Sequence, residues 1–296
     1  MYNTVDAVVV GQFVGTEALA AVGGTAGTLI NLLVGFFVGL TSGATVIIAQ
    51  FWGSGDIRGV SKTVHTAVAL CLACGAFLTV VGIALSRWAL SLMSTPDDVI
   101  ELSATYMRIY FAGTIPSLIY NIGSSILRAV GDSKRPLYFV AIACVPNVVL
   151  DFIFVGALKL SSAGAAYATV VSQALSLVLS VIYLCRNNFI FDFKLKSFLP
   201  KLDKVKKIIS LGLPSSIQNT VSSISFLLMT ALANDYGGVN ASAAIGIVGK
   251  FNGFAILPAI AMSSSVSSMA GQNIGAGLYD RAKKTMWIAL RISLLI

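Results

Sequence analysis

Long apolar stretches, separated by short polar turns, make up most of this 296-residue sequence. They reach the roughly 20 residues that a helix needs to cross a hydrocarbon core of about 30 Å. Because they are rich in Gly, Ala and Ser and lack the strict alternation of barrel strands, they predict an all-α polytopic membrane protein. Full spans are expected at Leu19–Gln50, Val60–Leu85, Ile100–Leu127, Pro136–Leu158, Ala163–Leu184, Leu211–Ala233 and Ala241–Met269. Partial spans at Tyr2–Val14 and Ala282–Ile296 bring the total to about nine.

The composition agrees with a membrane protein, since 56% of residues are hydrophobic, 11% are charged and the mean hydropathy is +0.87. Soluble domains carry about 25% charged residues. The net charge of +8 does not indicate nucleic-acid binding, because the basic residues lie between apolar stretches. No basic segment precedes Asp6, so we expect no cleaved secretion signal. No nucleophile–base arrangement or phosphate loop is visible, and we expect neither an enzyme nor a cofactor.

Basic residues gather in alternate turns, and this pattern predicts the topology. The turns after spans two, four, six and eight hold Arg58, Lys62, Arg128, Lys134, Arg135, Arg186, Lys194, Lys196, Lys201, Lys204, Lys206, Lys207, Arg281, Lys283 and Lys284. The turns on the other side hold only Arg87 and Lys159. Because cytoplasmic loops carry the excess of Lys and Arg, we expect the basic turns in the cytoplasm and the chain in the inner (cell) membrane.

The longest connection, 187–209, is basic and contains Pro200. It predicts a cytoplasmic linker, with a stretch that lies on the anionic inner leaflet. The linker would join an N-terminal lobe at 1–186, with helices 1–6, to a partial C-terminal lobe at 210–296, with helices 7–9.

The two ends of the chain resemble each other, which indicates an internal repeat. "GTEALAAVG" at 15–23 matches "GVNASAAIG" at 238–246, and "AQFWGSGDIRGVSKT" at 49–63 matches "GQNIGAGLYDRAKKT" at 271–285. The offset of about 222 residues covers six helices, so both copies have the same orientation and form a parallel repeat. We therefore expect two six-helix lobes, of which this chain lacks the start of helix 1 and most of the last four helices.

One predicted span carries polar residues that a lipid-facing helix would not keep. Asn147 and Asp151 are four residues apart and share a helix face, and Pro146 frees a backbone carbonyl beside them. A buried charge costs at least about 2.5–3.5 kcal/mol in a membrane, so Asp151 should meet a cation or a proton inside the bundle. Asp6 is a second acid within the first lobe. The alternative is a structural ion pair of Asp151 with Arg108 of span four.

Five segments together resemble the multidrug and toxic compound extrusion (MATE) family of cation-coupled exporters. They are "YNTVDAVVVGQFVGTEALAAVG", "LRAVGDSKRP", "PNVVLDFIFV", "AGAAYATVVSQ" and "LGLPSSIQN", in this order along nearly the whole chain. The resemblance implies two lobes around a central cavity and a monomeric design. It also implies a first-lobe cation site, which here would consist of Asp6, Asn147, Asp151 and Thr169.

The second lobe shows no matching acid. Asp6 corresponds in the repeat to Met229, and a Glu that some family members have on helix 7 is replaced by Ser222. Lys250 is the strong charge of span eight, and it either pairs, lines the cavity or extends its ammonium group to the membrane surface.

The resemblance thus implies an antiporter that exchanges Na⁺ or H⁺ for cationic or amphipathic drugs and toxins, with membrane lipids as its surroundings. Two alternatives stay open. A lipid-linked oligosaccharide flippase of the same superfamily would need a basic cavity, whereas this first lobe is acidic. A non-transporting truncated fragment would insert without forming a closed pathway.

Overall fold

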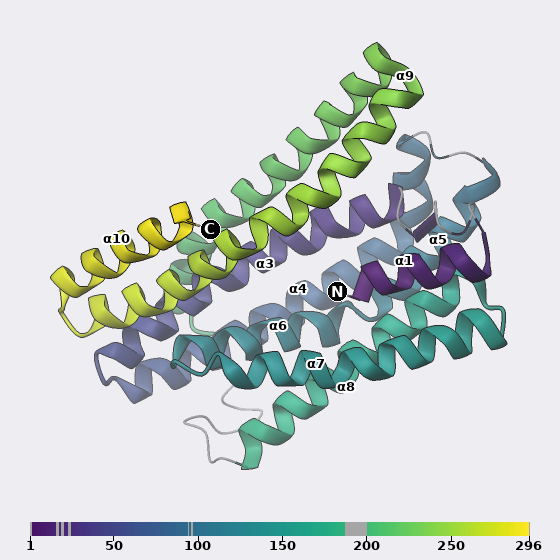
Figure 1. The fold of residues 1–296 in the computed structure, drawn as a ribbon. Helices are drawn as coiled ribbons and strands as arrows, with labels where there is room; N and C mark the ends of the chain where they lie inside the picture. The colour runs from purple at the N-terminus through teal and green to yellow at the C-terminus, as the bar shows by residue number, and fades with distance from the viewer. Residues whose placement is uncertain are drawn as a thin grey trace.

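The computed structural model describes residues 2–15, 18, 21–22, 25–93, 95, 97–186 and 200–295. Within these ranges it does not describe the side chains of 2–5, 7–8, 25, 97, 227, 230–231, 233–252 and 254. In the described part of the chain every regular element is helical, as the apolar pattern predicts (Figure 1). The elements are α1 (Tyr2–Phe13), α3 (Thr25–Gly53), α4 (Ile57–Leu92), α5 (Asp97–Ala112), α6 (Thr114–Ala129), α7 (Lys134–Asp151), the π-helix η1 (Phe152–Ala157), α8 (Ser161–Arg186), α9 (Leu202–Gly275) and α10 (Tyr279–Leu295).

Four helical segments of the described chain are long and apolar enough to cross a membrane. They are Ala26–Gly53, Ile57–Leu92, Lys134–Ala157 and Ser161–Arg186. Each coincides with one of the expected spans two, three, five and six, and their number supports a multi-pass membrane protein.

The span expected at Ile100–Leu127 is divided into two helices. The break falls at Gly113, where an added Cβ would overlap the side chain of Val170 on α8. Pro116 lies in the first turn of α6, where helical N–H groups have no intrahelical partner and the missing proline N–H costs little. The break therefore lies three residues before Pro116, where α8 approaches closely.

Helix α9 includes both spans expected at Leu211–Ala233 and Ala241–Met269, and it reverses direction between them (Figure 1). A straight helix of 74 residues would be about 110 Å long. Instead both of its arms lie against α3: Gly43 contacts Gly212 of the first arm, and Gly53 contacts Gln272 of the second. The first arm begins at Leu202, so the end of the expected linker 187–209 is helical; residues 187–199 lie outside the described chain.

The repeat found in the sequence coincides with a helix contact. A Cβ added at Gly53 would overlap the backbone carbonyl of Gln272, and one added at Gly275 would overlap that of Gln50. The 222-residue offset relates Gln50 to Gln272 and Gly53 to Gly275. Each of the two contacts is therefore the other one with the repeat copies exchanged. The two copies therefore pack side by side, in the same direction, around a local two-fold relationship.

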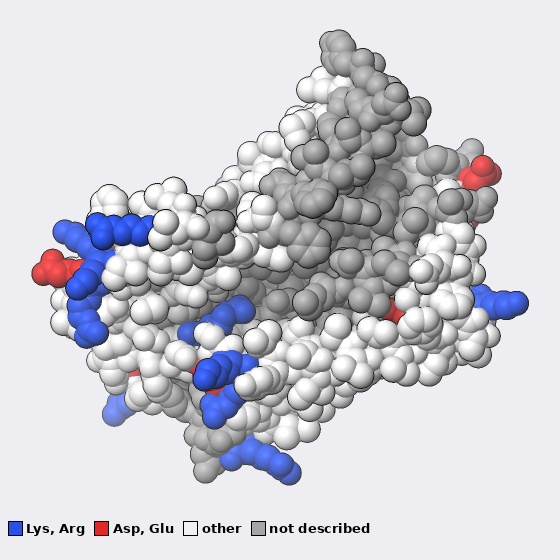
Figure 2. All heavy atoms as spheres, in the orientation of Figure 1, with Lys and Arg blue, Asp and Glu red and all other residues white. Residues whose placement is uncertain are grey.

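Two apolar clusters hold the described helices together. One surrounds Val10, Ile30 and Tyr106 and joins α1, α3, α4, α5 and α8. The other surrounds Ile48 and Ile126 and joins α3, α4 and α6 to the start of α9. Lys and Arg side chains gather at the end where α9 meets α10, and the arms of α9 diverge from the N-terminal helices toward the opposite end (Figures 1 and 2).

Candidate functional site

Asn147 and Asp151 lie on the same face of α7, as their spacing predicts, and both are fully buried. Asp151 is the last α-helical residue before η1 begins at Phe152. π-Helical turns are rare and are often found at functional sites. This turn could not be predicted from the sequence. Gly164 of α8 lies against it, since a Cβ added to this glycine would be 3.0 Å from the backbone of Phe154.

Asp6 and Thr169 complete the set from two other helices. Asp6 lies on α1 and Thr169 on α8, and neither is exposed. The Thr169 hydroxyl Oγ1 donates a hydrogen bond of 2.6 Å to Asp6 Oδ2. Asn147 and Asp151 lie close enough to the Asp6 carboxyl to interact with it. The structure thus brings together the four residues that the resemblance implied.

The site has more oxygen atoms than the protein satisfies. Asp6 Oδ1, both carboxylate oxygens of Asp151 and both polar atoms of the Asn147 amide are buried without a hydrogen-bond partner among the described residues. No Lys, Arg or His of the described chain forms an ion pair with either acid. Carboxylate, amide and hydroxyl oxygens are ligands that small hard cations prefer, and a carboxylate pair can also hold a proton.

The two basic residues singled out in the sequence do not belong to this site as described. Arg108 on α5 is exposed and does not pair with Asp151, so the ion pair considered as an alternative is not formed. An arginine guanidinium is more stable in water or among lipid headgroups than in an apolar core, which agrees with the exposure of Arg108. The side chain of Lys250 lies outside the described residues.

Tyrosines of α5 are neighbours of the site that sequence reasoning missed. Tyr106 is 2% exposed and lies close enough to Asp6 and Asp151 to interact electrostatically with both. The centroid of its ring is 6.2 Å from that of Tyr110, one helical turn further on. Tyr110 in turn lies next to Gln173 of α8. The four-residue spacing of the tyrosines in a predicted span was the available signal.

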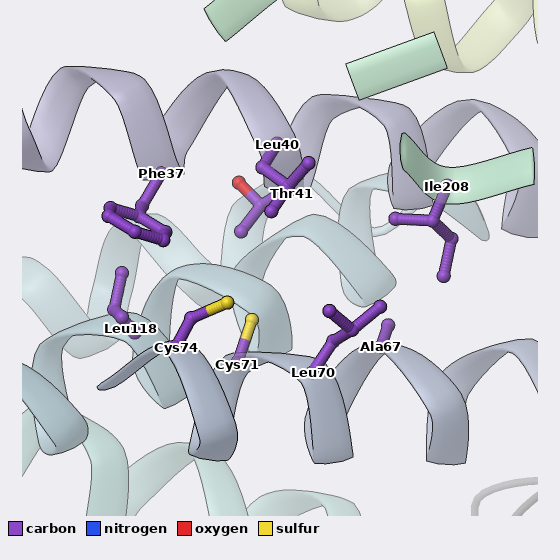
Figure 3. A pocket seen from close by; sticks show the side chains of 9 residues that line it. All are labelled: Phe37, Leu40, Thr41, Ala67, Leu70, Cys71, Cys74, Leu118 and Ile208. Carbon is purple, nitrogen blue, oxygen red and sulfur yellow. The ribbon is translucent and has the colours of Figure 1, made fainter. Parts of the chain in front are cut away.

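Two cysteines in a CxxC arrangement, Cys71 and Cys74, lie away from this site in an apolar environment. Cys71 and Cys74 of α4 line a small pocket with Phe37 and Leu40 of α3 and Leu118 of α6 (Figure 3). Both thiols are free, and the described residues contain no cluster of His, Cys, Asp and Glu that could hold a metal. Their surroundings are those of small side chains that pack one helix face against its neighbours.

Comparisons with known proteins place this geometry in a family. The family model described as MatE matches residues 1–153 and 214–296. The probable multidrug resistance protein YpnP of Bacillus subtilis (strain 168) is 32% identical over 276 residues, which cover 93% of this chain and 61% of that protein. The chain therefore spans less than two thirds of the length of this curated relative.

Solved structures show the same arrangement of helices. A multidrug resistance MATE family transporter of the MOP superfamily in an outward-facing conformation superimposes with a TM-score of 0.92 at 27% identity, over 99% of this chain and 65% of that one. The inward-facing conformation of a transporter with the same description gives 0.78 at 25% identity, over 99% and 67%. The family match over most of the chain, the shared fold and the identity to the Bacillus protein lead to one assignment: this chain belongs to the MATE family of transporters.

Proposed function

We propose that this chain belongs to a cation-driven exporter of cationic or amphipathic compounds. It forms the N-terminal lobe, which binds the driving cation, and part of the C-terminal lobe. Asp6 and Asp151, with Asn147 and Thr169, bind the driving Na⁺ or H⁺. The basic turns face the cytoplasm of the cell membrane, and α1 runs outward from it.

One observation carries the proposal: two carboxylates lie together in a buried site without a cationic residue of the described chain beside them. Two neighbouring negative charges in a low-dielectric interior repel each other, and each is also deprived of water. A proton or a small cation removes both penalties. The site is therefore suited to bind and release a cation, because its stability depends on whether the cation is present.

The arrangement of helices supports an outward-open state. The contacts between the repeat copies, at Gly53 and Gly275, lie toward the basic end of the bundle, and α9 diverges from the N-terminal helices at the other end (Figure 1). The closer match to an outward-facing relative agrees with this assignment. In such a state the driving cation enters from outside and binds at Asp6 and Asp151. Coupling then requires only that the cation and the exported compound favour different conformations.

Ethidium efflux from a drug-sensitive host tests this function. The gene with its flanking DNA is expressed as wild type and as Asp151→Asn, at fixed pH, with Na⁺ or with choline in its place. We expect efflux by the wild type and at least a tenfold slower rate for the variant at equal membrane levels. Dependence on Na⁺ would identify the ion.

Equal efflux by both proteins would show that Asp151 has a structural role and that the site assignment is wrong. If neither protein moves ethidium although both reach the membrane, then ethidium is not a substrate and the proposed export of cationic compounds loses this support. A basic dye of different shape and a labelled lipid-linked sugar then separate a narrower exporter from a flippase.

A further inference from the structure

A polar pocket of about 200 Å³ lies at the basic end of the bundle, away from the acidic site. One wall is formed by the end of α6 and the turn after it, with Arg128 and Ser133. The other wall is the second arm of α9, with Ser264, Ser265 and Ser268. The walls are joined by a hydrogen bond of 2.7 Å from the Gln272 amide to the backbone carbonyl of Ala129.

Arg128 places an unbalanced positive charge in this pocket. Its Nη2 donates to Ser125 Oγ at 3.1 Å, and its Nε is buried without a partner among the described residues. The next acid along the chain, Asp132, pairs with Arg135 at 2.6 Å. No acid of the described chain forms an ion pair with Arg128. A guanidinium group held partly out of water in this way requires an anionic partner.

A hydroxyl on the facing helix is also unused. Ser268 is 6% exposed, and its Oγ is buried without a hydrogen-bond partner. A buried hydroxyl left without a partner destabilises the fold, because it has lost its hydrogen bonds to water. Arg128 and Ser268 thus offer unsatisfied donors from two helices to one small space.

We propose that this pocket binds a phosphate group, held by the Arg128 guanidinium and the Ser268 hydroxyl. A planar guanidinium matches the geometry of phosphate oxygens, and serine hydroxyls add short hydrogen bonds. The volume is smaller than the roughly 300–1,000 Å³ of sites for drug-sized ligands, whereas a phosphate group and a few waters fit it. The phosphate comes either from solution or from the headgroup of an anionic lipid at the membrane surface.

The bound phosphate would bridge the N-terminal lobe to the second lobe, because α6 belongs to the first and the second arm of α9 to the other. It would therefore stabilise the conformation in which the basic end is closed, by its differential affinity for that state. This inference does not depend on the coupling ion or on the exported compound.

Thermal unfolding of the purified protein in detergent tests the site, with inorganic phosphate added against chloride at matched ionic strength. Phosphate also stabilises proteins without binding, so the comparison between variants decides. Arg128→Gln should raise the half-saturating phosphate concentration tenfold or more. Ser268→Asp should raise the melting temperature without phosphate, since its carboxylate replaces the anion, and should abolish the response. Arg281→Gln removes an exposed positive charge at the same end and should respond like the wild type.

A second arm of the experiment separates the two sources. Phosphatidic acid is added to the micelles against diacylglycerol, with and without inorganic phosphate. Protection by both forms of phosphate supports a site for the group itself, and protection by phosphatidic acid alone supports a lipid headgroup. A response of Ser268→Asp equal to that of the wild type would overturn the proposal, even if Arg128→Gln fails to fold. So would the absence of any phosphate-specific response in the wild type.

Discussion

Thr169 and Asp6, 163 residues apart in the chain, are joined by a buried hydrogen bond of 2.6 Å. The bond connects the short first helix α1 to α8 and fixes one oxygen of the Asp6 carboxyl, while the other oxygen has no partner in the described part of the chain. The Asp6 carboxyl is thus held in place through one oxygen, and its other oxygen is left to bind a cation or a proton.

Thr169→Val keeps the shape of the side chain and removes the donor. Asp6 then has two unsatisfied buried oxygens, and the loss of a hydrogen bond to a charged group costs about 1–3 kcal/mol. We expect the melting temperature in detergent to fall by several degrees, whereas Thr169→Ser, which retains the hydroxyl, stays near the wild type. Equal stability of the Val and Ser variants would show that this bond is not formed in the membrane protein.

The two acids should act as a unit. Asp6→Asn and Asp151→Asn each remove one of two mutually repelling charges, so each should leave the folded protein as stable as the wild type or more stable when no cation is added. Each should also reduce export at least tenfold. Efflux of the double variant should be no lower than that of either single variant, because groups that act together are not additive. Losses that multiply in the double variant would indicate two independent sites.

Gly53 lies where the backbones of the two repeat copies come into close contact. Gly53→Ala adds a Cβ that meets the Gln272 carbonyl, and overpacking of this kind costs about 1–3 kcal/mol. Gly35→Ala is the matched control on the same helix, because its Cβ would have open space and alanine favours the helix by up to about 1 kcal/mol. The melting temperature should therefore fall for Gly53→Ala and stay level or rise for Gly35→Ala. The same shift for both would mean that the helix contact contributes nothing to stability.

Arg108→Gln should leave efflux and its ion dependence unchanged. The side chain is exposed and makes no pair with Asp151, so its charge does not balance the site. Transport assays at equal membrane levels measure this directly. A change in the ion dependence would show that Arg108 moves to the acids during the transport cycle.

The sequence predicted the parts of this structure that depend on local pattern. Apolar stretches located the four helical segments that are long and apolar enough to cross a membrane. The four-residue spacing placed Asn147 and Asp151 on one helix face, and the repeat related Gly53 to Gly275. The resemblance, rather than the spacing, supplied Thr169. Each of these features can be recognised within a few residues or by comparing two segments of the chain.

What the sequence did not reveal depends on contacts between helices. The break at Gly113 follows from the approach of Val170, and the π-helix after Asp151 packs against Gly164. Tyr106 belongs to the surroundings of the site because α5 packs against α8, the helix that carries Thr169. The charge of Arg128 could be read in the sequence, but not that the second arm of α9 brings Ser268 to face it.

Cation binding to the purified protein tests the central claim most directly. Binding of ²²Na⁺ and proton uptake in weakly buffered detergent solution are measured for the wild type, Asp151→Asn and the control Arg108→Gln. In the range of pH and Na⁺ concentration where transport is active, the account predicts that the wild type and the control each bind about one cation, Na⁺ or H⁺. It predicts no cation at this site in Asp151→Asn. Binding by Asp151→Asn equal to that of the wild type would contradict it.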